Sequence, residues 1–170
     1  MNFAEILRHI PDFPEEGIDF IDITTVLQDP EAFTALINAM KDQVEELKPE
    51  LVVGAESRGF ILGAPLAYAL GVGFVPVRKP GRLPHDTISE DYALEYGTNS
   101  LEIHTDSIKK GQRVLIVDDL LATGGTAQAS CKLVEKLGGQ VVGLSFFVEL
   151  KDLNGRNKLG DYPVNVLVSL

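Results

Sequence analysis

Apolar residues along the chain change their spacing from segment to segment, and this change predicts helices that alternate with strands. After Asp29 and Pro30, which suit a helix N-cap and first turn, apolar side chains recur every three or four residues up to Leu47. A helix is therefore expected from residue 30 to about residue 48. Short runs of apolar and β-branched residues predict strands at 51–53, 74–77, 114–117, 141–148 and 164–168.

Two of the intervals between these strands have helical character. The apolar segment 59–70 ends at Gly71, although Pro65 inside it leaves the start of the helix uncertain, and helical spacing returns at 127–137. Two β-α-β units predict an α/β fold with a central, mostly parallel sheet flanked by helices. No repeat or linker divides residues 1–170, so a single domain is expected. In such sheets ligands bind beyond the carboxyl ends of the strands.

Composition narrows the classes of function. Of the 170 residues, 45% are hydrophobic, which is typical of a globular protein. The formal net charge of -10 argues against binding to nucleic acid. A phosphorylated small molecule remains a candidate ligand, provided that basic residues, amides or a metal ion gather at its site.

Targeting and metal signals are weak. A single cysteine, Cys131, and no secretory signal favour the cytoplasm. Residues 59–77 are uncharged but are interrupted by prolines and glycines, so a buried helix and strand explain them better than a membrane span. The three histidines lack metal-ligand spacing.

The most informative segment follows the strand predicted at 114–117. Asp118 and Asp119 precede a Thr-Gly-Gly-Thr turn at 123–126, which leads into the next helix. Adjacent carboxylates can accept hydrogen bonds from a vicinal diol, and a glycine-rich turn at a helix N-terminus offers amides and partial positive charge to a phosphate. A plain strand-to-helix turn with capping threonines and solvated aspartates is the alternative. The combination of all nine residues from 118 to 126 argues against it.

This segment resembles the phosphoribosyl pyrophosphate (PRPP) signature of type I phosphoribosyltransferases. The resemblance implies that Asp118 and Asp119 hold the ribose 2- and 3-hydroxyls. It implies that the 5-phosphate is held by the 122–126 loop, which consists of Ala122, Thr123, Gly124, Gly125 and Thr126.

Three further segments resemble the adenine-specific branch of that family. Residues 11–24 resemble a hood (residues 1–28) that covers the base, with Phe20 and Ile21 in the pocket. The family usually has a basic residue where this chain has Ile21, so no side-chain contact is carried over to it. The alternative for these residues is an N-terminal arm that only packs on the core.

The second segment, 54–60, resembles the pyrophosphate loop of the family. The resemblance implies that Glu56, Ser57 and Arg58 bind the diphosphate, and family members often have a cis peptide where Glu56–Ser57 stands. Arg58 could instead serve as a structural ion-pair partner.

The third segment, 79–97, is rich in proline, glycine and charge, and resembles a mobile lid loop. Arg78, Lys79 and Arg82 form the basic cluster that PRPP requires, with Arg82 where the family commonly has lysine. By the resemblance, Glu95 approaches the purine imidazole and Tyr96 lines the site. Without the other motifs, this Glu-Tyr-Gly would be interpreted as a solvated strand end.

The resemblance thus implies conversion of adenine and PRPP into AMP and pyrophosphate, with Glu95, Asp118 and Asp119 as catalytic residues. It also implies Mg²⁺, held mainly by PRPP and water, and a homodimer. The alternatives are a related enzyme for another nucleobase and a PRPP-sensing regulator without catalysis. Residues 151–163 are expected to form an ordered loop, and no chemistry is assigned to them.

Overall fold

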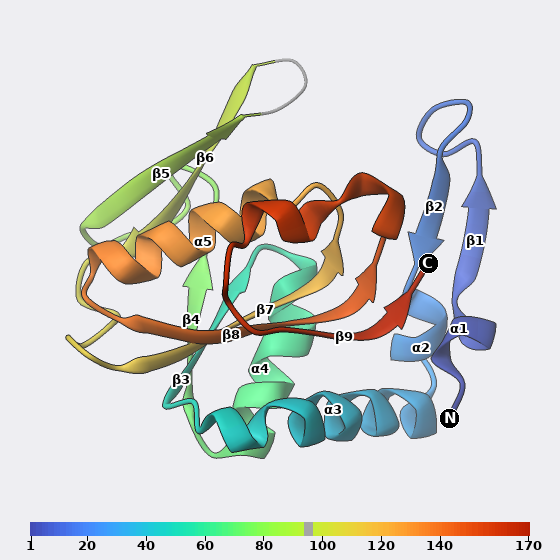
Figure 1. Ribbon diagram of the computed structural model, residues 1–170, viewed down its shortest axis with the longest axis horizontal. Coiled ribbons are helices and arrows are strands. Elements are labelled where there is room, and N and C mark those ends of the chain that lie inside the picture. The colour runs from blue at the N-terminus through green and yellow to red at the C-terminus, as the bar shows by residue number, and fades with distance from the viewer. Residues whose placement is uncertain (94–96) are drawn as a thin grey trace.

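Figure 1 shows the computed structural model of the chain, which describes residues 1–93 and 97–170. Five parallel strands form its central sheet, in the order β4-β3-β7-β8-β9. The α/β fold with a parallel sheet that the sequence predicts is therefore confirmed. The strands are β3 (Leu51–Ala55), β4 (Gly73–Val77), β7 (Arg113–Leu121), β8 (Gln140–Glu149) and β9 (Val164–Ser169).

Helices cover both faces of this sheet (Figure 1). Successive strand residues point to opposite faces, so Val52 packs with one helical layer and Val53 with the other. The layer on Val52 contains α3 (Pro30–Val44) and α4 (Arg58–Leu70), with the short helices α1 (Phe3–Ile6) and α2 (Thr24–Leu27). The layer on Val53 contains α5 (Gly125–Lys136).

The local signals explain where the helices begin and end. The Asp29 side chain accepts a hydrogen bond from the Ala32 amide at 2.7 Å, which caps the start of α3. A 3-10 turn, η1 (Glu45–Leu47), follows α3 and completes the predicted helix. Helix α4 continues through Pro65 and ends at Gly71, which has a φ of 72°.

The order of the strands places a crevice between β3 and β7. From β3 the chain crosses to β4 on one side, whereas from β7 it passes to β8 and β9 on the other. Beyond the carboxyl ends of two such strands no connection fills the space, and ligands collect there in α/β sheets. The segments that follow β3 and β7 are the two that carry the sequence motifs.

Two antiparallel ribbons stand outside the central sheet. The β1–β2 ribbon is formed by β1 (Arg8–Pro11) and β2 (Asp19–Asp22), within the segment expected to be a hood. The β5–β6 ribbon is formed by β5 (Thr87–Ala93) and β6 (Thr98–His104).

Part of the segment predicted as a lid loop, 79–97, is therefore a strand. On β5, Ile88 and Tyr92 pack against the core, and on β6 the side chains of Leu101 and Ile103 are buried. This apolar face stabilises a ribbon that would be marginal on its own. Leu94, Glu95 and Tyr96 lie outside the described residues.

The segment after β8 is more regular than the expected loop. It contains two 3-10 turns, η2 (Lys151–Leu153) and η3 (Gly155–Lys158), before β9 begins. Across residues 1–93 and 97–170, no helix has both the length and the apolar character that a membrane crossing requires.

Candidate active site

A cavity of about 440 Å³ lies at the carboxyl ends of β3 and β7. This volume falls within the range of small-molecule sites. Its walls contain the residues that follow β3, the paired aspartates and the whole 122–126 loop. The lining residues are Glu56, Ser57, Arg58, Asp118, Asp119, Leu120, Leu121, Ala122, Thr123, Gly124, Gly125, Thr126, Ala127 and Phe146.

The paired aspartates belong to β7 itself, because that strand extends beyond the predicted end at residue 117. Asp118 still pairs with Phe146 of β8, so both carboxylates are fixed by the sheet. Asp119 is 6% exposed, and its amide donates to Asp118 Oδ1 at 2.9 Å. Arg58 Nε lies 2.6 Å from Asp119 Oδ2, so the guanidinium balances the negative charge of this carboxylate.

Asp118 has an unusual ionisation. Part of the residue is exposed, but its Oδ1 atom lies against the first turn of α4. A Cβ on Gly59 in that turn would come within 2.9 Å of it. This burial and the adjacent Asp119 carboxylate raise the pKa of Asp118 well above its ordinary value of 3.8. One site therefore holds two adjacent carboxylates in different electrostatic surroundings.

The 122–126 loop presents backbone groups to the cavity. Gly124 is the N-cap of α5 with a φ of 87°, a conformation that favours glycine. Because no side chain caps α5 at this residue, the first amides of the helix are left for another acceptor. A helix N-terminus of this kind attracts an anion.

The turn after β3 supplies charge. The Glu56–Ser57 peptide bond is cis, at the position where the resemblance implies such a bond. Glu56 accepts hydrogen bonds from the Lys79 amide at 2.7 Å and from Arg78 Nε at 3.3 Å. Burial opposes ionisation of Glu56, but these bonds and the positive charges of Arg78 and Arg82 outweigh it and lower the pKa below 4.5. Glu56 thus gathers the predicted basic residues beside the cavity.

Arg58 also connects the cavity to the β1–β2 ribbon. Its guanidinium carbon lies 5.8 Å from the centre of the Phe20 ring, within the range of a cation–π contact. Ile21, the next residue, is partly buried and packs with the core layer that contains α3 and α4. Of the predicted site residues, Glu95 and Tyr96 lie outside the described part of the chain.

Sequence reasoning missed several residues around the cavity. Phe146 lines it, but in the sequence this residue is only one apolar position in a buried strand. Tyr92 of β5 lies so close to the loop that a Cβ on Gly125 would come within 3.0 Å of its ring. Gly155, in the segment to which no chemistry was assigned, contacts the loop from the other side.

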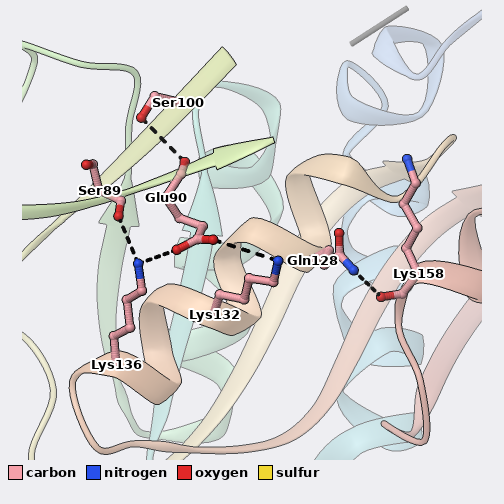
Figure 2. Close-up of polar contacts among 7 residues, drawn as sticks. All are labelled: Ser89, Glu90, Ser100, Gln128, Lys132, Lys136 and Lys158. Atoms are coloured by element: carbon pink, nitrogen blue, oxygen red, sulfur yellow. Dashed lines mark hydrogen bonds and ion pairs between the residues drawn. The ribbon is translucent and has the colours of Figure 1, made fainter. Parts of the chain in front are cut away.

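Figure 2 shows the polar contacts that flank α5. Glu90, on the inward face of β5, pairs with Lys136 and lies 3.8 Å from Lys132. Toward the opposite end of the helix, the Gln128 side chain donates to the carbonyl of Lys158 at 3.1 Å. The helix that begins in the 122–126 loop is therefore held by neighbours on two sides.

The charged groups do not form a preassembled metal site. Within 1–93 and 97–170, no three His, Cys, Asp or Glu side chains converge as metal ligands would. The cavity nevertheless carries the carboxylates of Glu56, Asp118 and Asp119 beside the basic groups. This set suits a cation that arrives with a phosphorylated ligand and keeps much of its water.

Comparisons with known proteins agree with the motif. The model of the phosphoribosyl transferase domain family matches residues 22–167. The adenine phosphoribosyltransferase of Acetivibrio thermocellus is 63% identical over 169 residues, covering 99% of each chain.

Solved structures give the same picture. The crystal structure of the adenine phosphoribosyltransferase from Thermoanaerobacter pseudethanolicus has a TM-score of 0.97 and 56% identity, covering 99% of this chain and 98% of that one. The enzyme from Saccharomyces cerevisiae, solved with adenine and an imino-altritol bisphosphate, has a TM-score of 0.92 and 45% identity, covering 95% and 94%.

Proposed function

The chain belongs to the adenine phosphoribosyltransferase family, and we propose how its residues make AMP and pyrophosphate from adenine and PRPP. That transfer is the activity of the family and of this chain. One observation carries the assignment of the site: the paired aspartates and the uncapped N-terminus of α5 line one cavity, at the crevice between β3 and β7.

PRPP binds with its 5-phosphate in the 122–126 loop and its ribose beside Asp118 and Asp119. The loop supplies amides and the positive end of the α5 dipole. The carboxylates accept hydrogen bonds from the ribose hydroxyls and stabilise the positive charge that develops on the sugar. They act as acceptors and as fixed charge rather than as a base.

The diphosphate of PRPP lies against the turn after β3. Ser57 and Arg58 line the cavity there, and Glu56 holds Arg78 and the Lys79 amide at its edge. The Arg58 guanidinium, now paired with Asp119, supplies positive charge between the carboxylate and the leaving group.

Adenine lies toward the β1–β2 ribbon. Phe20 covers the base, and backbone groups near Ile21 bind its edge, as in the family. Adenine N9 attacks ribose C1 from the face opposite the diphosphate, so the configuration of C1 is inverted. Glu95 holds or moves a proton on the N7 side of the purine, and the lid excludes water from the sugar cation.

Magnesium is the expected cofactor, and the donor set fits it. PRPP oxygens and water would form most of its coordination shell, with Asp118 and Asp119 close to the ribose hydroxyls. The bound ion would neutralise the diphosphate and make it a better leaving group. The carboxylates still orient the ribose, and Arg58 still carries the positive charge beside it.

We also propose a cytoplasmic homodimer. Helix α4 exposes apolar side chains on the face away from the sheet, among them Ile61 at 43% and Tyr68 at 89%. A helix that is apolar all round is usually covered. Sedimentation analysis would give twice the mass of the chain, and a monomer at micromolar concentration would contradict this proposal.

The test of the function uses purified protein with PRPP and magnesium. Pyrophosphate release is measured separately with adenine, hypoxanthine, guanine, xanthine and uracil. Release with adenine alone, together with AMP as the product, is the expected result. No release with adenine, or faster release with guanine, would refute the assignment.

A further inference from the structure

The backbone of Gly155 lies directly against the back of the 122–126 loop. A Cβ on Gly155 would collide with the carbonyl oxygen of Ala122 and come within 3.0 Å of a methyl group of Leu121. Conversely, a Cβ on Gly124 would come within 3.2 Å of the carbonyl carbon of Gly155. Two glycines thus allow two backbones to touch, so the loop cannot move toward Gly155 without displacing it.

Arg156, the next residue, anchors this contact to the sheet. Its Nε and Nη2 atoms donate to the two carboxylate oxygens of Glu149 at 2.7 and 3.0 Å. Glu149 is 5% exposed and ends β8. The hydrogen bonds from Arg156 lower the pKa of Glu149, and the same pairing raises the pKa of Arg156. A planar guanidinium fork fixes direction as well as charge.

Further hydrogen bonds connect this segment to both ends of the loop. Before the loop, the Leu150 amide donates to the Leu121 carbonyl at 3.0 Å. After the loop, Gln128 of α5 donates to the Lys158 carbonyl, as Figure 2 shows. The segment from Leu150 to Lys158 therefore spans the loop from its entry to its exit.

We propose that Gly155 and Arg156 are positioning residues that hold the 122–126 loop in the shape that receives the 5-phosphate of PRPP. The proposal rests on the proposed function, because it assigns the phosphate to this loop. Several amides must converge on one anion, and a displacement of about 1 Å is costly in a site of this kind. A support fixed in advance avoids that displacement and the cost of ordering the loop on binding.

The competing explanation is that this segment only completes the core, where Leu159 is 1% exposed. Loss of packing would then lower stability without favouring one substrate. The two explanations differ in which KM changes, so the test compares both substrates in each variant.

Gly155→Ala is the sharpest variant. Gly155 does not have a left-handed φ, so alanine is acceptable to its own backbone, and the added methyl group acts by pushing on Ala122. The KM for PRPP should rise about tenfold while the KM for adenine stays within about twofold. Arg156→Lys, which keeps the charge but loses the fork, should raise the KM for PRPP about threefold.

Gly143→Ala is the matched control. Gly143 also lacks a left-handed φ and is also crowded, with a Cβ within 2.8 Å of the end of the Leu47 side chain, but it lies in β8 away from the loop. Because the end of the Leu47 side chain can move aside, the melting temperature should fall less than in Gly155→Ala, and both KM values should stay at the wild-type level.

Hydrogen exchange in the ligand-free proteins gives a readout that does not depend on activity. Amides of the 122–126 loop should exchange faster in Gly155→Ala and Arg156→Lys than in wild type or Gly143→Ala. Unchanged exchange there, or an equal rise of both KM values, would overturn the proposal. If the wild-type protein makes no AMP, the proposed function fails, and the exchange data still decide whether Gly155 and Arg156 hold the loop.

Discussion

Arg58 lines the cavity together with the 122–126 loop and contacts Phe20 of the β1–β2 ribbon, yet the loop and the ribbon are held in different ways. The loop lies between Gly155 on one side and the Tyr92 ring on the other, and it follows a strand that is paired along its length. The ribbon is formed by two strands of four residues each. Besides the packing of Ile21 on the core layer, surface contacts hold it, such as the pair of Arg8 and Asp22 at 3.6 Å.

Because the two regions are held differently, we expect them to contribute differently to substrate recognition. A region built from backbone contacts and glycines tolerates few sequences, so it leaves a recognisable motif. Exposed ion pairs and ring contacts contribute little each and are easily exchanged. We therefore expect PRPP recognition to depend on the loop side and adenine recognition on the ribbon side, with little effect of one on the other.

The largest effect should come from the loop side. Asp119→Asn removes a buried charge beside the ribose and leaves Arg58 without its partner. We expect kcat/KM for PRPP to fall about a thousandfold, as when a group that stabilises transition-state charge is removed. Steady-state kinetics would measure it, with exposed Asp42→Asn as the control. A loss below about tenfold would remove Asp119 from the catalytic set.

On the ribbon side, Phe20→Ala should act on adenine alone. Loss of the covering ring should raise the KM for adenine about tenfold and leave the KM for PRPP within about twofold. Phe13→Ala removes only the ring that contacts Phe20 edge to face at 5.3 Å, and because Phe13 is 49% exposed we expect a smaller rise in the KM for adenine than in Phe20→Ala. Equal changes in both KM values of Phe20→Ala would show that the two sides are not separate.

The same contrast explains what the sequence could predict. The strands and helices around the cavity follow from apolar spacing, capping residues and glycines, and the nine residues from Asp118 identify the loop. The contact of Gly155 with Ala122 joins residues far apart in the chain through backbone atoms, and no side-chain pattern reveals it. Phe146 is likewise indistinguishable from any other buried strand residue until the sheet is assembled.

The β5–β6 ribbon shows a second limit of sequence reasoning. Charge, proline and glycine in 79–97 predicted a loop, yet Ile88 and Tyr92 alternate with Glu90 along β5 and pack against the core, where both are partly buried. The strand forms because α5 offers apolar surface and two lysines to that face, and these partners come from a distant part of the chain.

A smaller effect is expected where this ribbon meets α5. Glu90 is only partly exposed and pairs with Lys136, as Figure 2 shows. Glu90→Gln should lower kcat/KM about threefold. Adding Lys136→Met should lower it little further, because the ion pair between the two side chains is already lost in the single variant. A double-mutant cycle would measure the coupling. Fully additive losses would mean that the pair does not hold the ribbon.

The smallest effect concerns stability rather than turnover. Burial and Asp119 raise the pKa of Asp118, so between its ordinary pKa of 3.8 and the raised value the folded protein binds more protons than the unfolded chain. The contribution of Asp118 to the free energy of unfolding of the ligand-free protein therefore decreases as pH rises through that window.

Asp118→Asn should remove this contribution, so its melting temperature should fall less than that of the wild type as the pH rises from acid toward neutral. Differential scanning calorimetry across the pH range would measure the shift against wild type. A variant whose melting temperature depends on pH as the wild type does would contradict the raised pKa.

The most direct test of the division between the two sides is the kinetics of Gly155→Ala, Phe20→Ala and the double variant. We expect the double variant to have the PRPP KM of the first and the adenine KM of the second, so that the losses add in free energy. A KM for adenine that changes with Gly155→Ala, or a KM for PRPP that changes with Phe20→Ala, would contradict it.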